Sequence, residues 1–138
     1  MIKEIKHQFM TYRNGIIADT LRKAGMPYSI IFGLQLPQIS AIAREYAPSM
    51  ELATELWEDK NVRESRLLAC YLFPADAMTE EKCLELAESI QTKEEADILC
   101  FRLLRRLPFA ETLSLKLTAN DTPLISYCGE ALRRNLDA

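Results

Sequence analysis

Apolar residues recur three and four positions apart along most of the chain, and prolines and capping residues interrupt this pattern. Such spacing places apolar side chains on one face of a helix, whereas a half-buried strand alternates them every second residue. The pattern predicts helices over residues 2–24, with a break near Asn14 and Gly15, and then over 37–46, 49–58, 62–73, 79–90, 93–107, 109–119 and 123–136. We therefore expect an all-α chain of eight or nine helices with no strands.

Local capping signals support several of these boundaries. Thr92 and Glu95 have the spacing of a capping box, and Asn61 with Glu64 approximates one. Pro123 suits the first position of a helix, where its missing N–H is not needed. The two apolar-rich helices that follow the capping boxes are each expected to end just before a proline.

The apolar helices also resemble one another at a regular spacing. Residues 67–70 precede 98–101 by 31 positions with the same residue classes, and Cys100 with its following Leu-Arg-Arg recurs 28 positions later at Cys128. A two-helix unit repeated about every 30 residues is typical of an α-solenoid, in which each repeat buries one face on the next. Chance similarity among leucine-rich helices is the alternative. The predicted architecture is an α-α superhelix of three or four repeats, forming a single domain over residues 1–138.

Composition agrees with a helical chain in a reducing compartment. Leucine occurs twenty times and valine once, at Val62, which disfavours a sheet. The four cysteines form no CxxC pair, which predicts core thiols rather than a metal site or a disulfide framework. No apolar run approaches a membrane span, and the charged first six residues do not resemble a signal peptide. We expect a cytoplasmic protein with no membrane partner.

Charge and histidine content exclude several functions. The one histidine, His7, argues against a multi-histidine metal site and a conventional Ser-His-Asp triad, so no metal and no cofactor are expected. The formal net charge is −3 and the pI about 5.3. Without a global positive field, any nucleic-acid partner must meet a local basic patch.

Three stretches between residues 28 and 107 resemble the AlkD-like DNA alkylation repair family. Residues 32–39 resemble the Gly-x-x-x-Pro segment of that family, and residues 56–57 with 63–69 resemble its LW and E-x-R-x-x-A segments. Residues 90–104 resemble the segment that contains the family's functional aspartate. The resemblance implies HEAT-like helical repeats.

The resemblance also implies a DNA glycosylase that removes cationic alkylated purines while gripping double-stranded DNA on a concave basic surface. The functional aspartate falls on Asp97, where a carboxylate would stabilise positive charge that develops on the sugar. The family's preceding tryptophan is Lys93 here, Ser40 replaces an arginine, and the arginine of the next repeat would fall near Ile125 or Ser126. Asp97 is therefore the one candidate catalytic residue. DNA backbone binding is a stronger expectation than glycosylase turnover, and enzymatic activity is left open.

Basic residues cluster on the second helix of successive predicted repeats. They are Arg63, Arg66, Arg102, Arg105, Arg106, Arg133 and Arg134. Stacked repeats would align them into a track, and arginine contacts phosphate with two parallel hydrogen bonds. Lys93 joins this predicted DNA-binding set.

Alternatives exist for these charges and for the protein as a whole. The arginines would also suit a solvated face balanced by glutamates, and Lys93 with Asp97 would suit an i,i+4 ion pair. An acidic outer face is expected at Glu80, Glu81, Glu85 and Glu88. The alternative function is a non-enzymatic helical-repeat module that binds a protein partner.

Overall fold

The computed structural model describes residues 1–137, and its regular elements are helical. Within these residues there are nine α-helices, two 3-10 turns and no β-strand beyond one isolated bridge between Ile30 and Val62. The prediction of an all-α chain with eight or nine helices is confirmed. The chain divides into two compact units, Met1–Phe73 and a second that begins at Pro74. A single domain over residues 1–138 stays a prediction.

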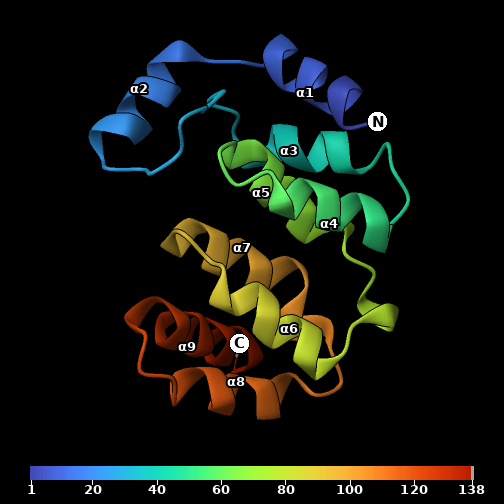
Figure 1. Ribbon diagram of the computed structural model, residues 1–138, viewed down its shortest axis with the longest axis vertical. Helices are drawn as coiled ribbons and strands as arrows, with labels where there is room; N and C mark the ends of the chain where they lie inside the picture. The colour runs from blue at the N-terminus through green and yellow to red at the C-terminus, as the bar shows by residue number, and fades with distance from the viewer. Residues whose placement is uncertain (138) are drawn as a thin grey trace. The chain divides into compact units, whose positions relative to one another are not determined.

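The first unit contains five helices, of which the last two form an antiparallel hairpin (Figure 1). They are α1 (Ile2–Thr11), α2 (Gly15–Lys23), α3 (Leu36–Ala43), α4 (Met50–Glu58) and α5 (Arg63–Leu72). In this unit α5 packs against α3 and α4, and α1 contacts α4. The predicted break near Asn14 is confirmed: its side chain accepts hydrogen bonds from the backbone N–H groups of Ile16 and Ile17 and so caps α2.

The second unit contains four α-helices arranged as two successive hairpins (Figure 1). Its elements are η1 (Ala75–Ala77), α6 (Glu80–Glu88), α7 (Lys93–Arg102), η2 (Leu104–Arg106), α8 (Ala110–Thr118) and α9 (Pro123–Asp137). The first helices of the two hairpins, α6 and α8, contact each other, and so do the second helices, α7 and α9. Contact between equivalent helices is how repeats of an α-solenoid stack.

A pair of cysteines shows the repeat at atomic level. Cys100 and Cys128 occur at equivalent positions of α7 and α9, and their sulfur atoms lie 3.6 Å apart. The Cys100 thiol also donates to the backbone oxygen of Cys128 at 3.3 Å. Both are fully buried, as are Cys70 and Cys83. Burial, followed by the charge of Glu80, raises the pKa of the Cys83 thiol to about 12. The expected core role of the cysteines is confirmed.

The predicted capping box at Thr92 is largely confirmed. The Thr92 hydroxyl accepts a hydrogen bond from the backbone N–H of Glu95. The Glu95 carboxylate reaches back to the N–H of Gln91, one residue before the N-cap. The predicted extent of this helix to residue 107 is wrong, because α-helical geometry ends at Leu103 (φ −123°, ψ −64°). The chain continues from there as the tighter 3-10 turn η2, with Leu103 and Leu104 both fully buried.

The predicted capping role of Glu64 is wrong. Val62, not Asn61, is the N-cap of α5, and no side chain caps it. The fully buried Glu64 carboxylate instead accepts hydrogen bonds from the backbone N–H groups of residues 32, 33 and 34 at 3.0, 3.0 and 3.3 Å. Arg63 Nη1 donates to Glu64 at 2.7 Å and to the oxygen of Leu34 at 3.0 Å. Two of the stretches that resemble family segments, residues 32–39 and 63–69, are thus hydrogen-bonded to each other.

The loop held by Glu64 requires glycine at position 33. Gly33 has a φ of +86°, in the region that side-chain-bearing residues rarely adopt. A Cβ atom there would also collide with the backbone oxygen of Asn14. The N–H of Asn14 donates to the oxygen of Phe32 at 2.8 Å, so this loop is joined to α2 as well as to α5.

Candidate nucleic-acid interface

Arg63 and Arg66 do not lie on a surface track, contrary to the sequence-based expectation. Their exposed fractions are 4% and 0%. The Arg66 guanidinium lies over the Trp57 ring at 3.6 Å and donates to the Trp57 backbone oxygen at 2.6 Å. Arg63 is bound to Glu64 and Leu34. Because both guanidinium groups bind partners inside the first unit, they are structural and unavailable to a phosphate.

In the second unit, four side chains from α7 and α9 form a connected group, here called the tyrosine cluster: Lys93, Asp97, Tyr127 and Arg134. The Tyr127 hydroxyl donates to Asp97 at 2.8 Å. Lys93 Nζ lies 5.1 Å from the centroid of the Tyr127 ring, and the Arg134 guanidinium carbon lies 5.6 Å from it. Lys93 and Asp97 lie one turn apart on one face of α7, and Tyr127 and Arg134 lie two turns apart on one face of α9. The two helices pack against each other, which brings the four side chains together.

The expected ion pair between Lys93 and Asp97 is not formed. Within residues 1–137, neither side chain lies within 4 Å of the other's charged group. Donation to Asp97 is the main cause that raises the pKa of the Tyr127 phenol, followed by burial and the charge of Asp97, whereas Arg134 acts to lower it. The phenol therefore stays protonated near neutral pH and keeps its hydrogen bond to Asp97.

A second group, here called the phenylalanine cluster, follows one turn further along α7. It contains Phe101, Arg102 and Arg105. The guanidinium carbons of Arg105 and Arg102 lie 4.1 and 5.2 Å from the centroid of the Phe101 ring. Arg105 Nε donates to the Phe101 backbone oxygen at 2.6 Å. This bond uses Nε alone, and a guanidinium group has further N–H donors on its two Nη atoms.

Five of the predicted DNA-binding cations are exposed on the second unit: Lys93, Arg105, Arg106, Arg133 and Arg134. In the described part of the chain, none of the five has a carboxylate within 4 Å. The alternative of a solvated face balanced by glutamates stays open for these five cations. No hydrogen bond or ring contact among residues 1–137 links Arg133 to the two clusters.

The predicted acidic face lies on α6. Glu80, Glu81, Glu85 and Glu88 all belong to this helix, and Glu80 forms an ion pair with Lys116 of α8. Acidic residues also occur on α7 and α9, so the charges are not separated by helix. A phosphate backbone would be attracted locally to the exposed cations of the second unit and repelled by α6.

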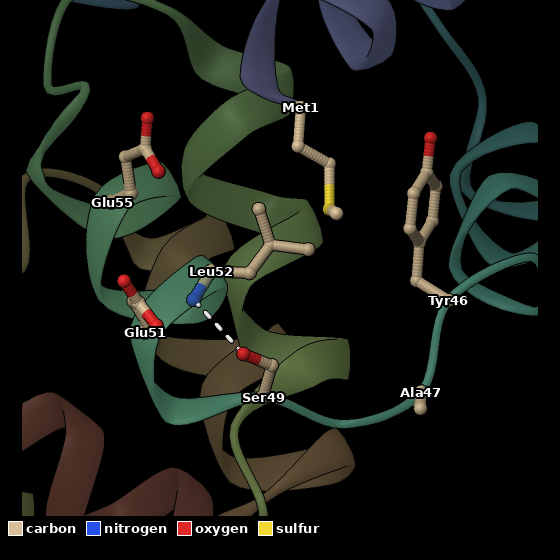
Figure 2. Close-up of a pocket in the computed structure, with 7 residues that line it drawn as sticks. All are labelled: Met1, Tyr46, Ala47, Ser49, Glu51, Leu52 and Glu55. Carbon is tan, nitrogen blue, oxygen red and sulfur yellow. Dashed lines mark hydrogen bonds between the residues drawn. The ribbon is translucent and has the colours of Figure 1, made fainter.

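A pocket of about 410 Å³ in the first unit has the wrong charge for DNA (Figure 2). Figure 2 shows the carboxylates of Glu51 and Glu55 on one side of it and Tyr46 on the other. Burial and the charges of Glu45 and Glu4 raise the pKa of the Tyr46 phenol, which reflects these acidic surroundings. The pocket is therefore unsuited to a phosphate backbone.

Sequence analysis missed Tyr127 and Phe101, although one of them had a detectable signal. Tyr127 lies 30 positions after Asp97, which is the length of one repeat, so the repeat spacing pointed to it. Phe101 had no such signal, because an isolated aromatic residue in an apolar helix usually belongs to the core.

Residues 1–137 contain neither a candidate metal site nor a membrane-spanning helix. This part of the chain contains no group of three or more His, Cys, Asp or Glu side chains arranged to hold a metal ion. It also contains no helix that is long and apolar enough to cross a bilayer.

Comparison with known proteins identifies a family and a fold. A sequence model described as DNA alkylation repair enzyme matches residues 5–123. No curated protein sequence matches the chain. A solved structure from proteins described as related to the HEAT-like repeat DNA glycosylases, with affinity for branched DNA structures, superimposes with a TM-score of 0.87 at 17% identity. The match covers 97% of this chain and 56% of the other, so this chain spans just over half of that structure's length. The HEAT-like repeat fold predicted from sequence is confirmed.

Proposed function

Because the chain belongs to the DNA alkylation repair enzyme family, we propose that its second unit binds DNA by contacting backbone phosphates with the exposed cations of α7, η2 and α9. One observation carries the proposal: Lys93, Arg105 and Arg134 are exposed beside aromatic rings, and none has a carboxylate within 4 Å among the described residues. When such cations contact the phosphates, counterions are released from the DNA, and this release drives binding independently of base sequence.

The aromatic rings support the proposal by positioning the cations. A cation over a ring face is held electrostatically, yet its N–H donors at the edge still bind an acceptor. Tyr127 holds two cations in this way and is itself held by Asp97. Positioned side chains lose less conformational entropy when a phosphate binds.

We expect the affinity of the protein for double-stranded DNA to fall linearly with salt on a log–log plot. Fluorescence anisotropy with a labelled duplex would measure the slope, which is about −0.9 per phosphate contact. Replacing Lys93, Arg105 and Arg134 together by alanine should make the slope less negative by up to about 2.7, since each lost contact contributes about 0.9. A labelled four-way junction belongs in the same series, because the solved neighbour is described as having affinity for branched DNA.

A matched control removes the same charge from the first unit. Lys3, Lys23 and Arg44 are also exposed, and their triple alanine variant should keep the wild-type slope. Equal slopes for the two variants would mean that net charge alone matters, and would contradict an interface on α7 and α9. No affinity of the wild-type protein for any DNA at low salt would reject DNA binding and favour the protein-partner alternative.

The catalytic role that the family resemblance implies for Asp97 is tested separately from DNA binding. Asp97 is exposed on α7 between Lys93 and Phe101, and one of its oxygens is occupied by the Tyr127 hydroxyl. We expect no release of alkylated purine from methylated DNA above background, because the Lys93 charge would repel a cationic base beside Asp97. Chromatography of released bases would measure this. Release that is abolished by Asp97→Asn would contradict the expectation and assign Asp97 a catalytic role.

The proposed location is the cytoplasm, as expected from sequence. The four buried cysteines suit the reducing conditions of that compartment.

A further inference from the structure

Phe101 is an exposed aromatic residue in the middle of the proposed DNA contact. Its exposed fraction is 43%, whereas Leu99, Cys100, Leu103 and Leu104, the apolar residues around it in sequence, are fully buried. The local fold thus excludes Phe101 from the core. Leu115 and Leu136 are the other large apolar residues exposed in the described part of this unit, and neither has a guanidinium group over its side chain.

The surroundings of Phe101 combine two chemistries. The ring offers an apolar π surface, and Arg105 and Arg102 place positive charge 4.1 and 5.2 Å from its centroid. A nucleotide matches both, because its base has a flat π face and its phosphate a negative charge. An acidic peptide would match the cations but not the flat ring surface, and an apolar helix would match the ring but not the cations.

In a continuous duplex each base is covered on both faces by its neighbours, so no base face is available to a protein side chain. An unpaired base at a gap, a fork or a branch point exposes such a face. Single-stranded nucleic acids are commonly bound by aromatic side chains that stack on bases inside a positively charged groove.

From this combination we infer that Phe101 stacks on an unpaired base while neighbouring arginines contact the flanking phosphates. The second unit then prefers DNA that contains unpaired nucleotides over a continuous duplex. This inference rests on the proposed DNA-binding function and specifies which DNA the same surface selects.

Tyr127 does not supply this contact. Its ring lies beside two cations, as that of Phe101 does, but its hydroxyl is fixed by Asp97. It is half-buried between α7 and α9, whereas Phe101 is exposed. Tyr127 is therefore a positioning residue for the two cations, and Phe101 is the ring that meets a base.

The experiment compares two DNA ligands of the same sequence, a continuous duplex and a fork with 2-aminopurine at the first unpaired position. The wild-type protein should bind the fork more tightly and quench its fluorescence through stacking. Phe101→Ala should weaken fork binding about tenfold and restore the fluorescence, because one base–aromatic stack is lost. Its salt slope should not change, since no charge is removed, and the loss of duplex affinity, which comes only from a less well positioned Arg105, should be clearly smaller than the loss of fork affinity.

Two further variants make the result specific. Phe101→Trp keeps a stacking ring and should retain both the preference for the fork and the quenching. Leu115→Ala removes another exposed apolar side chain, from α8, and should change neither. Far-UV circular dichroism of each variant checks that it is folded.

The possible outcomes separate this inference from the proposed function. If wild-type protein binds duplex and fork equally, or if Phe101→Ala weakens both equally, base stacking by Phe101 is rejected while DNA binding stands. If wild-type protein binds neither DNA, the proposed function itself fails.

Discussion

Replacing Glu64 by alanine is expected to lower the free energy of unfolding by about 3–5 kcal/mol, the largest effect that we predict for any single residue. Glu64 is fully buried, and its carboxylate accepts three backbone N–H groups of the loop at residues 32–34 as well as a bond from Arg63. The alanine variant leaves these donors and the Arg63 charge without that acceptor in a buried site. Urea unfolding followed by circular dichroism would measure the loss.

Glu55→Ala provides the control for this prediction. Glu55 is an exposed glutamate on α4 in the same unit, so its removal should change the free energy of unfolding by less than about 0.5 kcal/mol. A loss below about 1 kcal/mol for Glu64→Ala would show that the loop does not depend on this carboxylate.

Replacing Gly129 by alanine is expected to destabilise the second unit by about 1–3 kcal/mol or more. Gly129 lies on the face of α9 that meets the end of α8. A Cβ atom would collide with the backbone nitrogen and hydroxyl of Thr118 and approach the carbonyl carbon of Leu117 within 2.9 Å. Because most of these atoms belong to the backbone, no rotamer change relieves the collision, and α8 and α9 must separate.

Thermal unfolding and amide hydrogen exchange would detect this effect. Protection should fall first in α8 and α9, which form the most extensive helix pair of the second unit. Gly15→Ala is the matched control, because a Cβ at Gly15 meets nothing within 4 Å and alanine favours a helix. Unchanged stability in Gly129→Ala would mean that the two helices are less closely packed than the structure shows.

Most helix boundaries were predictable because the signals that set them are local. The side chain of Asn14 caps α2 within three residues, and Thr92 caps α7 in the same way. Periodicity, caps and prolines act over one or two helical turns, and a repeat of about 30 residues is visible without any contact between repeats. The fold class followed from these features, and the family from the three stretches that resemble its segments.

The candidate site was less predictable because burial depends on residues far along the chain. Arg66 of α5 and Arg105 of η2 were both assigned to the predicted basic track, yet one is enclosed against Trp57 and the other is exposed beside Phe101. The partner of Lys93 was likewise misassigned, since its ammonium group meets a ring on the next hairpin rather than Asp97 one turn away.

The sequence by itself determined the helical-repeat fold, because helix period, capping and repeat length are properties of neighbouring residues, and its resemblance to known segments indicated the family. Tertiary structure alone decided which arginines are buried and which are exposed. Glu64 reaches a loop 30 residues earlier, and Tyr127 reaches Asp97 30 residues before it. Such contacts form only when helices pack, so the same residue type becomes part of the core in one repeat and part of the exposed surface in another.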